Sequence, residues 1–333
     1  MRPSPFAFAV ALVSIAIALP AAGDAQTPTR MAGTALGQRA EIEVRDLAPD
    51  AAHEAIRAAF AELESAGAAL RALEESAEAA GGSKPVAVDA TSGELVRRAE
   101  AFCIWSEGAV SPLGGETYRL YGLRSPAAAL PAPEELQQAI ASGRCDRLTW
   151  FEERRELTVA AGSRLDFYPF ATGWAVDRAA ARLRGAGARN FWIGVGPMML
   201  GAGPGPGGLG WEVVPPPFPG LVEPLPSFYL RDRAAALLTS EDRPLRIAGD
   251  RFSSYIDLRR GRPGGAGLLA VFVVAELAVD AQGVGYAMFA LGPRDGTMLF
   301  GTLTPRPSAR WILGTGAGPP VLTDVNWSIV PRN

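Results

Sequence analysis

The stretch Leu165-Asp-Phe-Tyr-Pro-Phe-Ala-Thr-Gly-Trp-Ala-Val-Asp177 lies where the pattern of the chain changes. Before it, apolar residues recur at helical spacing over long segments. From Leu157 onward, short apolar segments alternate with glycine and proline turns, and one more helix is expected at Trp174–Leu183. Helices early and mainly antiparallel strands late predict an α+β fold rather than a doubly wound parallel sheet.

The segments before this stretch give one strand and three helices. Apolar and charged residues alternate over Gly37–Leu47, which is typical of a half-buried strand. Apolar residues at three- and four-residue spacing predict amphipathic helices over Asp50–Ala80 and Gly93–Ser106, and a short helix follows Pro133.

Seven strands are predicted in the second half of the chain from apolar runs bounded by glycine and proline. They are Phe191–Val195, Trp211–Val214, Ser227–Leu230, Ala235–Leu238, Phe252–Ile256, Leu268–Val274 and Trp311–Leu313. The glycine- and proline-rich segments between them are expected to be loops inside one domain rather than boundaries between domains.

Composition excludes several classes of function. The 333 residues are 48% hydrophobic and carry a formal net charge of -3, so the chain can bury a core and has no electrostatic footprint for nucleic acid. His53 is the single histidine and falls in the first turn of a predicted helix, which argues against a Ser-His-Asp hydrolase. No phosphate-binding Walker loop or dinucleotide fingerprint occurs.

The first 25 residues have the pattern of an export signal. Arg2 precedes an apolar run from Phe6 to Leu19, and small residues follow Pro20. We expect residues 1–25 to be removed, residues 26–333 to form a single periplasmic domain, and no membrane span to remain. Cys103 and Cys145 then form either a disulfide or two small buried apolar side chains.

Several short motifs occur together in a defined order. They are the 165–177 stretch, Ser254-Tyr-Ile-Asp-Leu-Arg-Arg-Gly-Arg-Pro263, Ala32-Gly-Thr34, Gly108-Ala-Val-Ser-Pro-Leu113, residues 190–196, Leu238-Thr-Ser240 and residues 278–292. In order and spacing this set resembles the FAD:protein FMN transferase family, the ApbE-type flavin transferases. The resemblance implies the α+β, T-fold-like architecture of these enzymes over a single flavin-transferase-like domain.

The resemblance also implies a chemistry. Family members are exported, bind FAD and Mg²⁺, and transfer FMN to a threonine or serine of a target flavoprotein, releasing AMP. The metal neutralises charge on the pyrophosphate, and a base takes the proton of the attacking hydroxyl. FAD, Mg²⁺ and a target flavoprotein are therefore the cofactor, metal and partner that the resemblance predicts.

The chain departs from the family at the positions that carry this chemistry. Ser254 occupies the place of the histidine base, and Thr172 that of a lysine. Gln282 and Tyr286 occupy the places of the Asp and Thr metal ligands, and neither suits Mg²⁺. Asp280 is the nearest carboxylate and could hold a metal only if its loop shifts.

Other family positions are retained. Gly33, Thr34, Gly173, Asp177, Ser240 and Asp257 match the family motifs and, with Thr172, are the candidate flavin-binding residues. Two interpretations stay open for each aspartate: Asp177 is a ligand or a residue of the helix surface, and Asp257 holds a ligand or braces a turn.

The motifs lead to three hypotheses. The first is an exported flavin transferase whose activity is impaired by the replaced base, lysine and metal ligands. The second is a non-catalytic exported protein that binds a flavin or a protein partner. The third is an active enzyme of altered specificity with a remodelled pocket.

Overall fold

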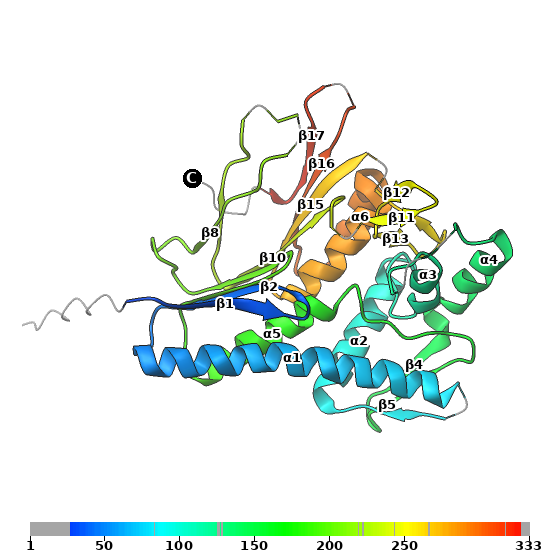
Figure 1. Ribbon diagram of the computed structural model, residues 1–333, viewed down its shortest axis with the longest axis horizontal. Coiled ribbons are helices and arrows are strands. Elements are labelled where there is room, and N and C mark those ends of the chain that lie inside the picture. The colour runs from blue at the N-terminus through cyan, green and yellow to red at the C-terminus, as the bar shows by residue number, and fades with distance from the viewer. Residues whose placement is uncertain are drawn as a thin grey trace, which may run out of the picture.

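An eight-stranded antiparallel sheet forms the centre of the computed structural model (Figure 1). The structure describes residues 27–327, apart from positions 83, 125, 126, 128, 219, 222, 243, 266 and 317, so the predicted signal 1–25 lies outside the described residues. From one edge to the other the strands are β1 (Thr29–Ala35), β2 (Gln38–Val44), β6 (Phe191–Val195), β7 (Met198–Ala202), β10 (Arg233–Thr239), β15 (Leu268–Ala275), β16 (Ser308–Leu313) and β17 (Val321–Val325).

The middle of the sheet is buried on both faces. In β15, Val271 and Val273 belong to the core under the helices, whereas Phe272 and Val274 pack in a second core against β8 (Trp211–Val213) and β9 (Phe228–Leu230). A strand covered on both faces has apolar residues on both, which explains the unbroken apolar run of β15.

Three helices cover the first of these faces: α1 (Pro49–Ala80), α5 (Ala171–Gly185) and α6 (Ala278–Phe300). Figure 1 shows α1 running below β1, and α6 lying beside β10 and β15. The apolar stripe of α1, with Ile56, Leu63 and Leu70, is buried against α5 and the sheet, and the helix ends at Gly81 in the left-handed conformation (φ 57°).

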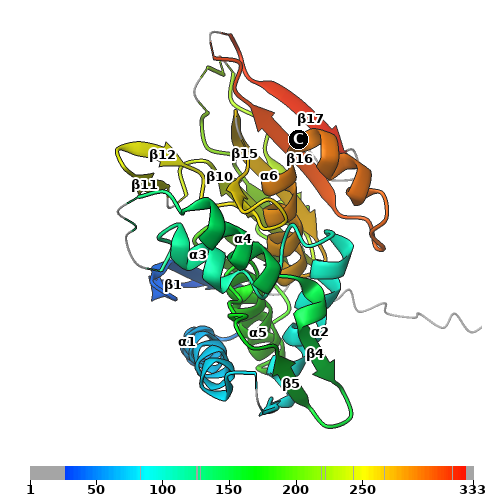
Figure 2. The same cartoon turned by 90° about the vertical axis from the view of Figure 1, so that its right-hand side faces the viewer.

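Smaller elements gather at one end of the molecule (Figure 2). They are α2 (Ala90–Trp105), α3 (Gly115–Leu120), α4 (Pro133–Ser142), the 3₁₀ turn η1 (Cys145–Arg147) and the small sheet of β3 (Val86–Ala87), β4 (Leu148–Phe151) and β5 (Glu156–Val159). Two hairpins complete the fold, β11 (Leu245–Ile247) with β12 (Asp250–Phe252), and β13 (Ile256–Asp257) with β14 (Arg262–Pro263).

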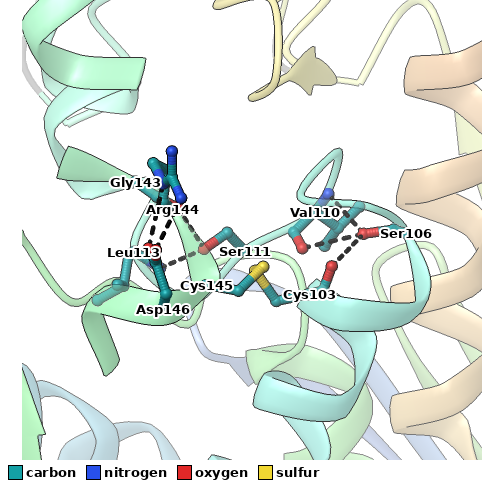
Figure 3. Close-up of a disulfide and its surroundings, with 9 residues drawn as sticks. All are labelled: Cys103, Ser106, Val110, Ser111, Leu113, Gly143, Arg144, Cys145 and Asp146. Atoms are coloured by element: carbon teal, nitrogen blue, oxygen red, sulfur yellow. Dashed lines mark hydrogen bonds and ion pairs between the residues drawn. A yellow bond between two sulfur atoms is a disulfide. The ribbon is translucent and has the colours of Figure 1, made fainter. Parts of the chain in front are cut away.

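A disulfide between Cys103 and Cys145 joins α2 to η1, which decides between the two alternatives for these cysteines (Figure 3). Beside it, the Ser111 hydroxyl donates to the Gly143 carbonyl at 2.9 Å and accepts the Leu113 N–H at 3.0 Å. Ser111, from one of the family-like motifs, therefore stabilises this loop.

The structure confirms the α+β fold with an antiparallel sheet and places the predicted helices and most predicted strands within a few residues. The continuous strand predicted at Phe252–Ile256 is wrong, because Phe252 ends β12, Ile256 begins β13, and residues 253–255 connect the two. The sequence pattern does not indicate α6. This helix contains four glycines and Pro293, and it is buried around most of its circumference up to Ala290, so it shows no amphipathic stripe.

No helix in the described part of the chain has the length and apolar content that a membrane span requires.

Candidate functional site

A cleft of about 440 Å³ brings two of the family-like motifs, residues 165–177 and 254–263, together with α1 and α6. Tyr168 and Thr172 come from the first segment, Tyr255 from the second, and Gln282 and Tyr286 from α6. The other lining residues are Leu36, Gln38, Gly67, Leu70, Arg71, Glu74, Arg124, Ala171, Gly196, Pro197, Leu238, Glu241 and Asp242.

Ser254, at the position of the family's base, is hydrogen-bonded to the backbone. Ser254 is buried, and its hydroxyl donates to the carbonyl oxygen of Asp242 at 2.9 Å. The neighbouring Tyr255 hydroxyl donates to the Asp242 carboxylate at 3.0 Å, and burial raises the pKa of Tyr255 well above its ordinary value. The Ser254 hydroxyl therefore has no side-chain base as a hydrogen-bond partner. Its bond instead connects the segment after β12 to the loop that contains Asp242.

Gln282, at one metal-ligand position, uses both atoms of its amide. Its Oε1 accepts the backbone N–H of Gly173 at 2.6 Å, and its Nε2 donates to the Tyr168 carbonyl at 3.4 Å. The side chain is 3% exposed. It links α6 to the start of α5, so its carbonyl oxygen is already in use where the family has a metal ligand.

Tyr286, at the other metal-ligand position, lies in an aromatic cluster. Its ring centroid is 5.6 Å from that of Tyr168 and 4.9 Å from that of Tyr255, both in edge-to-face contact. Burial raises the pKa of Tyr286 well above its ordinary value, so the hydroxyl stays protonated.

Asp280 is not in the cleft. The predicted loop is the helix α6, in which residues two positions apart point to nearly opposite sides. Gln282 lines the cleft, whereas Asp280 lines a different cavity and pairs with Arg98 at 2.6 Å. The loop shift that would bring Asp280 to a metal is therefore not available.

Mg²⁺ does not fit these residues. The oxygens at the two family positions are a bonded amide and a buried phenol, and Asp280, the nearest carboxylate along the chain, lines the other cavity. Of the carboxylates in the cleft, Glu74 and Asp242 are bonded to protein groups. Across the described residues, no group of three or more histidine, cysteine, aspartate and glutamate side chains converges to hold a metal ion.

Two further residues of the first segment connect α5 to its neighbours β2 and α6. The Thr172 hydroxyl lines the cleft and accepts from Gln38 Nε2 at 3.2 Å. Gly173 packs so closely on α6 that an added Cβ would lie 2.4 Å from the Ala278 carbonyl oxygen. Gly173 is therefore required by packing.

Asp177 caps α6. Its two carboxylate oxygens accept the N–H groups of Ala278 and Val279, each at 2.9 Å, and burial raises its pKa to about 7. These contacts favour a structural role over either of the interpretations that the sequence left open.

The remaining predicted residues lie outside the cleft lining. Gly33 and Thr34 are on the exposed edge strand β1. The backbone N–H of Ser240 donates to the Leu269 carbonyl, and Ser240 lines a neighbouring depression rather than the cleft. Asp257 is buried, accepts the Arg259 N–H at 3.1 Å and pairs with its guanidinium at 2.9 Å, which is the turn-bracing arrangement.

Charged residues that no sequence motif indicates form one end of the cleft. Arg124 makes a two-pronged ion pair with buried Asp166, and its guanidinium lies 5.6 Å from the Tyr168 ring centroid. Glu74 accepts the Phe167 N–H at 2.8 Å, and burial together with the charge of Asp166 raises its pKa to about 7. Arg71 precedes Glu74 by one turn on α1 and is exposed.

A sequence signal for this group is weak. Arg71 and Glu74 interrupt the border of an apolar stripe on α1, as any solvated residue would, and Arg124 belongs to a loop some 50 residues away. Only the fold brings them to one place.

Comparisons with known proteins agree with this architecture. The family model described as "ApbE family" matches residues 36–307. The fold is similar to the ApbE protein of Thermotoga maritima (TM-score 0.77, 19% identity, 90% of this chain and 97% of that chain) and to the apo flavinyl transferase ApbE of Pseudomonas stutzeri (0.75, 20%, 91% and 96%). It is also similar to the flavin transferase ApbE of Vibrio cholerae (0.72, 20%, 90% and 96%). No curated protein sequence matches the chain significantly.

Proposed function

Because the chain belongs to the ApbE family, we propose that it binds a flavin nucleotide in the cleft without transferring FMN from it. The observation that carries the proposal is the state of Gln282 and Tyr286. Both occupy the cleft wall at the family's metal-ligand positions, and both are committed to internal contacts. The cleft thus retains a binding surface and lacks the groups for transfer.

The lining suits a flavin nucleotide. Tyr168 offers a half-buried aromatic surface, which favours stacking with a planar ring system. Arg71 offers an exposed guanidinium group, which can bind phosphate oxygens in the absence of a metal, whereas the guanidinium of Arg124 is paired with Asp166. Binding is therefore expected to proceed without a divalent cation.

A second candidate rests on Glu74. A carboxylate in the cleft with a pKa of about 7 is suited to accept a proton near neutral pH. This favours the hypothesis of an active enzyme of altered specificity, with Glu74 as the proton acceptor. We rank it second because one oxygen of Glu74 is already bonded to the Phe167 N–H.

The test is AMP release from FAD. Purified protein lacking residues 1–25 is incubated with FAD and Mg²⁺, and AMP is measured by chromatography beside the Vibrio cholerae flavin transferase as a positive control. The proposal predicts no AMP above the level of a protein-free control. Mg²⁺-dependent AMP release would contradict it, and AMP release that is lost in Glu74→Gln would support the second candidate.

Export is part of the proposal. The signal pattern of residues 1–25 supports it, and so does the disulfide between Cys103 and Cys145, since disulfides persist in oxidising compartments. Expression of the full chain in a Gram-negative bacterium should give a periplasmic protein that has lost about 25 residues by mass. A full-length cytoplasmic product would contradict export.

The alternative partner is a protein. A non-catalytic family member could hold a protein that an active relative would modify. Pull-down from a periplasmic extract with wild-type protein and with Tyr168→Ala would test this. A partner that binds in the cleft should be captured by the wild type and not by the variant. Equal capture by both proteins would exclude recognition through the cleft.

A further inference from the structure

A second cavity lies across α6 from the cleft. It has a volume of about 290 Å³ and is enclosed by α2, the first turns of α6, the facing ends of β10 and β15, and the loop 303–307. None of its lining residues belongs to the cleft. The two cavities are therefore separate places on the molecule.

The inner wall of this cavity is apolar and aromatic. Phe102 and Val284 are buried, at 7% and 2% exposure. The Trp105 indole N–H donates to the Leu299 carbonyl at 3.2 Å and to the Thr302 hydroxyl at 3.1 Å, so its one polar atom is already satisfied. What remains of Trp105 for a ligand is an apolar ring surface.

The charged groups of the cavity leave a positive excess. Arg98, Arg233 and Arg306 contribute three guanidinium groups, against the two carboxylates of Glu276 and Asp280. Arg98 and Asp280 pair at 2.6 Å and neutralise each other. Within the described part of the chain, neither the Arg233 nor the Arg306 side chain has a hydrogen bond or an ion pair.

We propose that this cavity binds a small amphipathic monoanion, with its aromatic body against Phe102 and Trp105 and its acidic group at Arg233 and Arg306. Binding sites for small molecules combine a concave, mostly apolar surface with a few polar groups that fix the ligand's orientation. Guanidinium groups without a protein partner supply such polar groups for a carboxylate or sulfonate.

The inference goes beyond the proposed function and does not depend on it. A flavin in the cleft would meet Gln282 and Tyr286, whereas a ligand here would meet Val284 on another face of α6. Failure of flavin binding would leave this site untouched, and the reverse also holds.

The probe for the site is 1-anilinonaphthalene-8-sulfonate, an aromatic monoanion whose fluorescence rises in apolar surroundings. Arg233→Ala and Arg306→Ala should each weaken its binding by about fivefold, the loss expected for one partly exposed ion pair. Arg231→Ala is the matched control, because Arg231 lies two residues from Arg233 and does not line the cavity. It should leave the affinity unchanged.

A neutral probe separates charge recognition from loss of folding. N-phenyl-1-naphthylamine has the same aromatic body without the sulfonate, and its affinity should be the same in the wild type and in both arginine variants. Ala101→Trp, which fills the cavity from an exposed position on α2, should abolish saturable binding of both dyes.

Three results would overturn the proposal. They are sulfonate binding that is unchanged in both arginine variants, dye binding that survives Ala101→Trp, and displacement of the sulfonate dye by excess FAD. The last result would place the dye in the cleft.

Discussion

One side of α6 presents Gln282 and Tyr286 to the cleft, and another presents Asp280 and Val284 to the second cavity. On the cleft side, the oxygen and the nitrogen of the Gln282 amide are each hydrogen-bonded, and the ring of Tyr286 packs against Tyr168 and Tyr255. On the cavity side, Asp280 is paired and two arginines of the surroundings have no partner in the described residues.

The two sides of α6 thus differ in how far their polar side chains are engaged by the protein itself. Gln282 connects α6 to α5 through hydrogen bonds, and Tyr286 packs in the tyrosine cluster. The contact between α5 and α6 fixes which side of α6 faces the cleft.

Gly173→Ala should have one of the two largest effects on stability. The added Cβ would lie 2.4 Å from a backbone oxygen of α6, and relieving that overlap should cost about 3 kcal/mol of unfolding free energy. Urea denaturation measures it. Gly185→Ala on the same helix meets nothing within 4 Å and should be neutral or slightly stabilising. Equal effects in the two variants would contradict the tight α5–α6 contact.

The disulfide should stabilise the side of the molecule that holds α2 and the second cavity. Cys103→Ser with Cys145→Ser frees a loop with a sequence separation of 42 residues and should lower the unfolding free energy by about 3 kcal/mol. Dithiothreitol should lower the thermal midpoint of the wild type and leave that of the double variant unchanged. A reductant effect of the same size in both proteins would rule out the disulfide as its cause.

Some parts of the fold could be predicted from the sequence and others could not. The retained Gly173 and the α+β order followed from motifs and periodicity. The helix α6 did not, because its glycines and its burial on several sides hide the helical period. That omission also misplaced Asp280, since a loop can redirect a carboxylate and a helix cannot.

The charged end of the cleft could not be predicted from the sequence for another reason. Glu74, Arg124 and Asp166 come from three separate segments, and their pairing depends on how α1 packs beside the loop before α5. The base and ligand positions, in contrast, could be identified because the motifs that contain them are short and ordered along the chain.

Glu74 should make stability depend on pH. Its carboxyl has a pKa near 4 in an unfolded chain and about 7 in the folded protein, so the folded state binds more protons between these values. The stabilisation is complete below about pH 4 and is lost as the pH rises through 7. Asp177 acts in the same direction.

Thermal midpoints from pH 5 to 8 test this. Glu74→Gln should give a shallower fall than the wild type, with the remaining slope assigned to Asp177, whereas Glu75→Gln, at an exposed neighbouring position, should follow the wild type. A Glu74→Gln profile as steep as that of the wild type would exclude the raised pKa.

The smallest expected effect is on flavin affinity. Arg71→Ala removes an exposed guanidinium from the cleft and should weaken FAD binding by about fivefold. Arg57→Ala, also exposed on α1 and outside the cleft lining, should not. Equal affinities in the two variants, measured by calorimetry, would exclude Arg71 from phosphate recognition.

The central claim is that the cleft binds a flavin nucleotide and has no place for a divalent cation. Flavin fluorescence measured during titration of the mature protein with FAD, once with Mg²⁺ and once with EDTA, tests it most directly. The account predicts saturable binding with the same dissociation constant in both conditions. Binding that strengthens with Mg²⁺, or no binding in either condition, would contradict it.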